Sequence, residues 1–169
     1  LRLMPTLMLA AALTARAPAG AQAHVAELTP PSLGAGDTFA LAMDLHGADA
    51  VLAAPFKGPK TRGRAWVFDG ISGAVRYGLS PSTSNPGDAF GLALCVHNGL
   101  AAVSAATDQN GVNSGSVFLF DLQSGAELFE LRAQDGAAGD LFGFAVALGP
   151  GRLVVGAPGA DAGATDAGA

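Results

Sequence analysis

Oxygen-bearing side chains gather in one short stretch of the sequence, Asp108-Gln109-Asn110-Gly111-Val112-Asn113. Asp108, Asn110 and Asn113 flank a glycine, and side-chain oxygens are the ligands that calcium prefers. A single carboxylate is a weak ligand set for this ion, which usually binds several. A polar turn whose side chains bond their own backbone explains the same residues. Both interpretations stay open, and these three residues are the calcium candidates of the chain.

Positive charge gathers in a second stretch, where Lys57, Lys60, Arg62 and Arg64 fall within eight positions. Such a cluster can bind an anion or a partner. A run of charge is more often a solvated loop that offsets acidic neighbours, and the sequence favours this second interpretation.

A repeat positions both stretches. Gly-Asp pairs at 36, 87 and 139 give a period of 51 and then 52 residues, which is typical of a propeller or a solenoid. We divide the chain into a lead-in linker at 24–35, blade 1 at 36–86, blade 2 at 87–138 and a partial blade 3 at 139–169. Asp37, Asp88 and Asp140 recur in every repeat, so we expect them to have a structural role in a turn before the first strand.

Each complete repeat predicts four short strands. Large and small apolar residues alternate in the first strand, and only a sheet packed between two other sheets buries both of its faces. The first strands are predicted at Phe39–Leu45, Phe90–Val96 and Phe142–Leu148; the second at Val51–Ala54, Leu100–Ala105 and Leu153–Ala157; the third at Ala65–Phe68 and Val117–Phe120; the fourth at Ala74–Leu79 and Glu127–Arg132. The predicted fold is all-β, a partial β-propeller of about two and a half four-stranded antiparallel blades with no helix after residue 35.

The first strands carry further expectations. Each should be the innermost strand of its blade, with Phe39, Phe90 and Phe142 in equivalent places. Gly91, Ala93 and Cys95 should face one neighbouring sheet, and Leu92 and Leu94 the other. Cys95, the only cysteine, should be a buried and inert thiol.

A Phe-Gly start followed some fourteen residues later by Gly-Ala-Pro resembles the FG-GAP repeat. Blade 3 has both halves, Phe142-Gly143 and Gly156-Ala157-Pro158, and blades 1 and 2 have partial copies. The resemblance implies a blade of the kind found in the integrin α-subunit propeller and in exported bacterial proteins. The family's calcium loop is not carried over, because the connections at 44–49, 97–99 and 149–151 are short and lack alternating carboxylates.

Two and a half blades do not close a ring, since propellers have four to eight. We therefore expect the sequence to be part of a longer protein, or less readily a unit that completes itself by assembly.

Residues 1–23 predict a secretory signal peptide, with Arg2, an apolar run and the small-x-small site Ala21-Gln22-Ala23. Removing Arg2 and Arg16 leaves seven basic against 14 acidic residues, a net charge of −7. So acidic a chain is a poor binder of nucleic acid. No later segment is long and apolar enough to span a membrane.

No nucleophile elbow, phosphate-binding glycine loop or zinc motif occurs, so no catalytic or cofactor-binding residue is predicted, and we expect no enzyme. His46 and His97 fall in different repeats with no cluster around them, and predict neither metal binding nor catalysis.

The sequence therefore favours an exported module, in the periplasm, at the cell surface or outside the cell, that binds or scaffolds a protein or glycan through its rim loops. One alternative is a quinoprotein-like or other enzyme on a propeller, which residues 118–131 resemble, although Trp66 is the only tryptophan. Another is a purely structural surface array.

The first test concerns processing. The signal-like start predicts a mature N-terminus near His24, which N-terminal sequencing of exported protein can establish. Finding Leu1 retained on exported protein would count against the signal peptide.

The second test concerns calcium. Without the family's calcium loops, we expect a chelator to shift the melting temperature little. An ion held at 100 times its dissociation constant would stabilise the fold by about 2.7 kcal/mol. A clear and reversible loss of stability in chelator would instead assign calcium to Asp108, Asn110 and Asn113.

Overall fold

The computed structural model describes residues 27–58, 62–107, 114–161 and 167–169, and all the regular structure in them is β-strand. The strands are β1 (Ala42–His46), β2 (Asp49–Ala54), β3 (Arg64–Asp69), β4 (Val75–Leu79), β5 (Leu94–His97), β6 (Leu100–Ala105), β7 (Ser116–Asp121), β8 (Glu127–Leu131), β9 (Ala145–Gly149) and β10 (Arg152–Gly156). The signal-like residues 1–23 and the calcium candidates Asp108, Asn110 and Asn113 lie outside the described residues. Within the described ranges there is no helix, and so none that could cross a bilayer.

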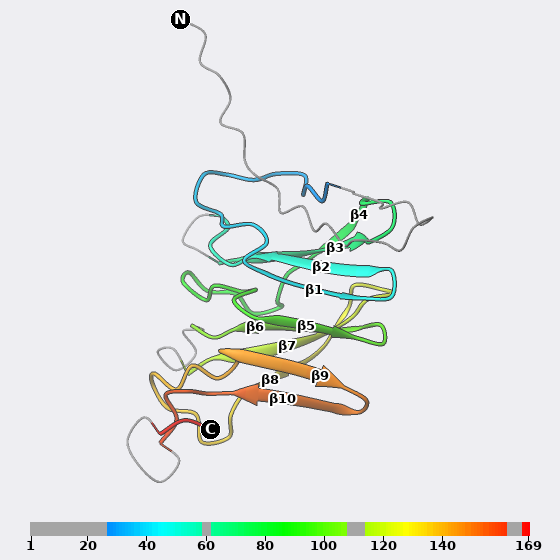
Figure 1. Ribbon diagram of the computed structural model, residues 1–169. Coiled ribbons are helices and arrows are strands. Elements are labelled where there is room, and N and C mark those ends of the chain that lie inside the picture. The colour runs from blue at the N-terminus through cyan, green and yellow to red at the C-terminus, as the bar shows by residue number, and fades with distance from the viewer. Residues whose placement is uncertain (1–26, 59–61, 108–113, 162–166) are drawn as a thin grey trace, which may run out of the picture.

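The strands form three antiparallel units. The sheet orders are β1-β2-β3-β4 and β5-β6-β7-β8, and β9 pairs with β10 in a hairpin. We call these units blade 1, blade 2 and blade 3. Figure 1 shows them stacked one upon the next, with their first hairpins along the same side of the stack. The predicted fold class is confirmed: an all-β, partial β-propeller.

The first strand of each blade lies on the inside. β1 contacts β5 and β5 contacts β9, while each is the first edge strand of its own unit. Leu94 packs into the cluster shared with blade 1, and Cys95 packs with the side chains of blade 3. The alternation in size therefore places these two neighbours on opposite faces, as the sequence predicts.

The first strands begin later than predicted. β1, β5 and β9 start at Ala42, Leu94 and Ala145, three to four residues beyond the phenylalanines. The preceding residues turn through positive φ, at Ala40 (62°) and Gly91 (98°) among others, and such a backbone cannot continue a strand. The predicted orientation of Gly91 is wrong for the same reason, because a Cβ on it would meet Ala53 of blade 1 instead of blade 3.

The phenylalanines before the inner strands do occupy equivalent places. The Phe39 ring lies 5.8 Å from that of Trp66 and 6.2 Å from that of Phe68, on the third strand of its own blade. In blade 2 the Phe90 ring lies 5.8 and 5.9 Å from the two phenylalanines on β7, Phe118 and Phe120. Both complete blades therefore fold this phenylalanine back onto their own third strand, and full burial, as at Phe90, stabilises the fold by about 1.5–3 kcal/mol.

The turn after the third strand is the same in both complete blades. Asp69 Oδ1 accepts hydrogen bonds from the Ser72 N–H (2.7 Å) and hydroxyl (2.9 Å), and Asp121 Oδ1 accepts the same pair from Ser124 at 2.7 Å each. The Ser72 N–H and hydroxyl, with Arg76, lower the pKa of Asp69 to about 2. Each aspartate therefore closes its turn by accepting hydrogen bonds from the serine three positions later.

Apolar side chains fill the space between successive blades. One cluster joins blades 1 and 2 and another joins blades 2 and 3. On the outer face of blade 1, Leu28 and Leu33 of the lead-in pack against the buried Trp66 and Phe68. At the other end of the stack β10 is an edge strand, and its Val154 is 66% exposed.

Glycines close the seam between blades. The Phe90 N–H donates to Arg62 O at 3.0 Å, which lays the start of blade 2 against Gly63 of blade 1. The Phe142 N–H does the same toward Ser114 O at 2.8 Å, beside Gly115. A Cβ on either glycine would lie 2.1 Å from the carbonyl oxygen of the opposing phenylalanine. Only glycine permits this approach.

A pair of substitutions separates this contact from backbone strain. Gly36 and Gly63 both have φ above +80°, but a Cβ on Gly36 meets nothing within 4 Å. We expect Gly36→Ala to lower the free energy of unfolding by about 1 kcal/mol from the positive φ alone. Gly63→Ala should cost a further ~1–3 kcal/mol because the seam must open.

Urea denaturation of both variants against the parent chain measures the difference. Equal losses would show that the seam tolerates a side chain and that the close approach is not a constraint.

Candidate functional site

The two ends of the blades differ in their loops. One end carries the turns before the inner strands and the connections that follow the second strands, namely the described parts of 34–41, 55–63, 85–91, 106–115, 137–143 and 157–169. We call it the loop rim. The opposite end, the hairpin rim, carries the short β1–β2, β5–β6 and β9–β10 turns (Figure 1). The sequence predicts binding through the loop rim.

Three buried aspartates hold the loop rim in shape. Asp37, Asp88 and Asp140 each accept, at Oδ2, the backbone N–H of the residue three positions earlier; this contact is 2.7 Å for both Asp37 and Asp140. Their own N–H groups donate back to the carbonyl of that same residue at 3.3–3.4 Å. The structural role predicted for them is confirmed. The turn differs in detail, because the carboxylate reaches backward along the chain.

Asp37 has a second partner in Lys57, whose ammonium lies 3.0 Å from its carboxylate and 2.5 Å from Ser32 O. Burial acts to raise the pKa of Asp37, but the Gly34 N–H and Lys57 outweigh it and hold the pKa below its usual value. Lys57 therefore ties the lead-in to blade 1.

The other described members of the basic stretch are also engaged within the fold. Arg62 donates to Ser84 O at 3.1 Å, and the Arg64 guanidinium lies 5.9 Å from the centre of the Trp66 ring. Lys60 lies outside the described residues. Lys57 offsets an acidic neighbour, as the favoured interpretation expects, whereas Arg62 and Arg64 contact a backbone carbonyl and an aromatic ring.

A groove does open on the loop rim between blades 2 and 3. It has a volume of about 420 Å³ and lies between the connection from β8 to β9 and the segment after β10. Its lining consists of Ala133, Asp135, Ala137, Asp140, Phe142, Val155, Ala157, Ala160, Asp161 and Ala169. We call it the interblade groove. Its volume falls in the range of small-ligand sites, and apolar walls with a few polar groups are typical of them.

All the charge in the interblade groove is negative. Asp140 is buried and accepts the Ala137 N–H in its turn, and Asp135 and Asp161 are exposed. Carboxylates accept hydrogen bonds from ammonium, guanidinium and hydroxyl groups. The groove therefore suits a basic side chain or a sugar hydroxyl, and it is unsuited to an anion.

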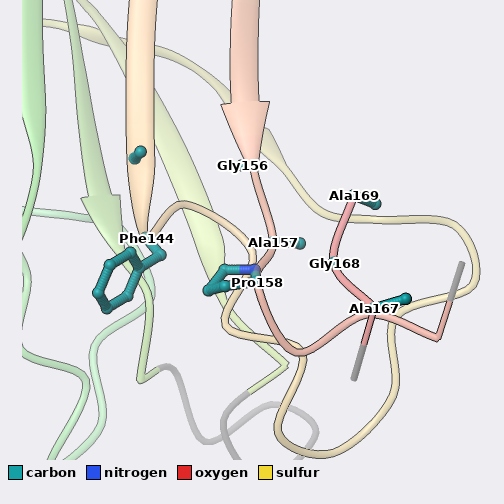
Figure 2. A pocket seen from close by; sticks show the side chains of 8 residues that line it. Phe144, Gly156, Ala157, Pro158, Ala167, Gly168 and Ala169 are labelled. Atoms are coloured by element: carbon teal, nitrogen blue, oxygen red, sulfur yellow. The ribbon is translucent and has the colours of Figure 1, made fainter. Parts of the chain in front are cut away.

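A second cavity lies on the other side of the same segment. Figure 2 shows Phe144 and the end of β10 on one side and Ala167–Ala169 on the other. Ala157 and Ala169 exchange backbone hydrogen bonds at 2.7 and 2.9 Å, which fold the last residues back beside β10. This cavity, about 360 Å³, is lined by alanines, glycines, one proline and one phenylalanine, and so has no polar side chain to orient a ligand.

The hairpin rim brings together two residues that sequence reasoning kept apart. The rings of His46 and His97 lie with their centres 4.9 Å apart. The sequence does contain the signal, because the two positions are 51 residues apart, which is the repeat period. The interblade groove, by contrast, has no sequence signal, since Asp135 and Asp161 come from unrelated positions in two repeats.

Comparisons with known proteins support the repeat. The FG-GAP repeat family matches residues 127–169, from the last strand of blade 2 to the end of the chain. No curated protein sequence matches the chain.

Among solved structures, the computationally designed Ika4 protein is similar at 19% identity with a TM-score of 0.51, over 74% of this chain and 63% of that one. BamB from Moraxella catarrhalis (20% identity, TM-score 0.46) and Sqt1 from Saccharomyces cerevisiae (13%, 0.47) match 75% and 85% of this chain. The chain spans 63% of the length of the designed protein and 33% of each of the other two.

Proposed function

We propose that the chain is part of an exported FG-GAP propeller that binds or scaffolds a partner through its loop rim. The FG-GAP match covers residues 127–169, and the proposal extends the repeat to blades 1 and 2. The support for this step is that Phe39 and Phe90 pack on the third strand of their own blades in the same way. An integrin α-like architecture of the exported bacterial kind is part of the proposal.

The observation that carries a binding role is the interblade groove. Two exposed carboxylates, Asp135 and Asp161, lie at the edge of an apolar depression on a rim whose turns are fixed by buried aspartates. A rigid scaffold loses little entropy when it binds, so contacts at such an edge convert efficiently into affinity. The partner that fits best is a protein with basic side chains or a glycan with hydroxyl donors.

Location outside the cytoplasm rests on the signal-like residues 1–23. A single cysteine, buried and without a disulfide partner, is compatible with an oxidising compartment. The proposal places the protein in the periplasm, at the cell surface or outside the cell.

The test uses arrays of glycans and of basic peptides probed with the purified chain. We expect saturable binding to one of these classes. The double variant Asp135→Asn/Asp161→Asn should weaken it at least tenfold, about 1.4 kcal/mol, because charge-assisted hydrogen bonds are lost.

The matched control is Glu27→Gln/Asp49→Asn, which removes one carboxylate of the lead-in and one of blade 1, neither of which lines the interblade groove, and this variant should bind like the parent chain. Equal weakening in both variants would indicate a general effect of net charge. Absence of saturable binding on both arrays would contradict the binding role.

A further inference from the structure

His46 and His97 form a pair at the hairpin rim, far from the loop rim where the proposed function is placed. Their ring centres are 4.9 Å apart and the ring planes are inclined by 60°. His46 is exposed and His97 half-buried, so both are open to solvent.

The fold holds both histidines at the same level. Each is the last residue of an inner strand, with His46 opposite Asp49 and His97 opposite Leu100 across tight hairpins. A hydrogen bond also joins the two strands directly, because the Val96 N–H donates to Asp44 Oδ2 at 2.7 Å. The backbones that carry the two rings are therefore fixed relative to one another before any ligand arrives.

The separation suits one metal ion shared by two imidazoles. A zinc–nitrogen bond is about 2.1 Å, so the ring centre lies roughly 3.2 Å from the ion, and two rings at a tetrahedral angle have centres about 5.2 Å apart. The observed 4.9 Å is close to this value. The χ2 torsion of histidine is broad, so the nitrogens can turn toward a common point with little cost.

Neighbouring groups define the kind of site. Both carboxylate oxygens of Asp44 are occupied, by the N–H groups of Leu45 (2.8 Å) and Val96. The Cys95 side chain is buried in the apolar cluster between blades 2 and 3. No group of three or more metal-binding side chains occurs in the part of the chain that the structure describes.

We propose that His46 and His97 bind a borderline transition-metal ion, Zn²⁺, Ni²⁺ or Cu²⁺, as an open two-imidazole site whose remaining positions are filled by water or by a ligand from solution. Imidazole favours these ions and the affinity should increase from Ni²⁺ to Cu²⁺. Calcium should not compete, because it requires several oxygen ligands.

The experiment is a titration of the full chain with Zn²⁺ and with Ni²⁺ by calorimetry. The chain has three histidines, and the third, His24, is removed by His24→Gln so that the pair contains the only imidazoles. We expect this variant to bind one ion per chain. Adding His46→Gln or His97→Gln should weaken binding at least tenfold in each case, and a large excess of Ca²⁺ should change nothing.

Two outcomes would overturn the proposal: no binding below millimolar ion, or binding that survives either added substitution. Circular dichroism and thermal unfolding without metal show whether each variant is folded. If a variant is not folded, the test is NMR spectroscopy of the His24→Gln chain with trace Cu²⁺. Selective broadening of both imidazole Hε1 signals supports the shared site, and broadening of one or neither refutes it.

Discussion

The structure depends on the close contact between the start of each repeat and the blade before it. At this seam the backbone of Phe90 or Phe142 lies directly against a glycine of the preceding blade, leaving no room for a Cβ. The second residue of the Phe-Gly pair is under the same constraint, since a Cβ on Gly91 would lie 2.5 Å from that of Ala53. The seam thus explains in physical terms why the motif contains glycine. Blade 1 supports this, because Ala40 replaces the glycine and Leu28 and Leu33, not another sheet, cover that face among the described residues.

The turn before each inner strand lies at this seam and outside the sheet, so interactions other than sheet hydrogen bonds must hold its conformation. A buried aspartate does this by accepting a backbone N–H that would otherwise be unsatisfied, and the cost of burying the carboxylate is offset by that charge-assisted bond. The phenylalanine then turns inward and fills the space over its own third strand. The aspartate, the phenylalanine and the glycine therefore act together to form the contact between successive blades.

Much of this fold could be predicted from the sequence, because the pattern that specifies a blade occurs several times in it. The repeat period predicted the blades, and the alternation in size predicted that Leu94 and Cys95 lie on opposite faces of the inner strand. The strand starts were predicted too early. The positive φ of Ala40 has no signal in a non-glycine residue, whereas Gly91 and Gly143, which fall inside the predicted strands, are glycines that could have indicated the turn. The interblade groove could not be predicted from the sequence either, because it arises from the shapes of two connections that do not repeat.

The repeat period also explains why His46 and His97 are neighbours in space. In a propeller the inner strands of successive blades lie side by side, so two residues one period apart on these strands are neighbours in space. His46 and His97 are separated by 51 residues, like Gly36 and Gly87, and their rings meet. The next position in the series, 52 residues on, is Gly149, which has no side chain that could bind a metal ion. The period thus accounts both for the pairing of two imidazoles and for the absence of a third at this level of the stack.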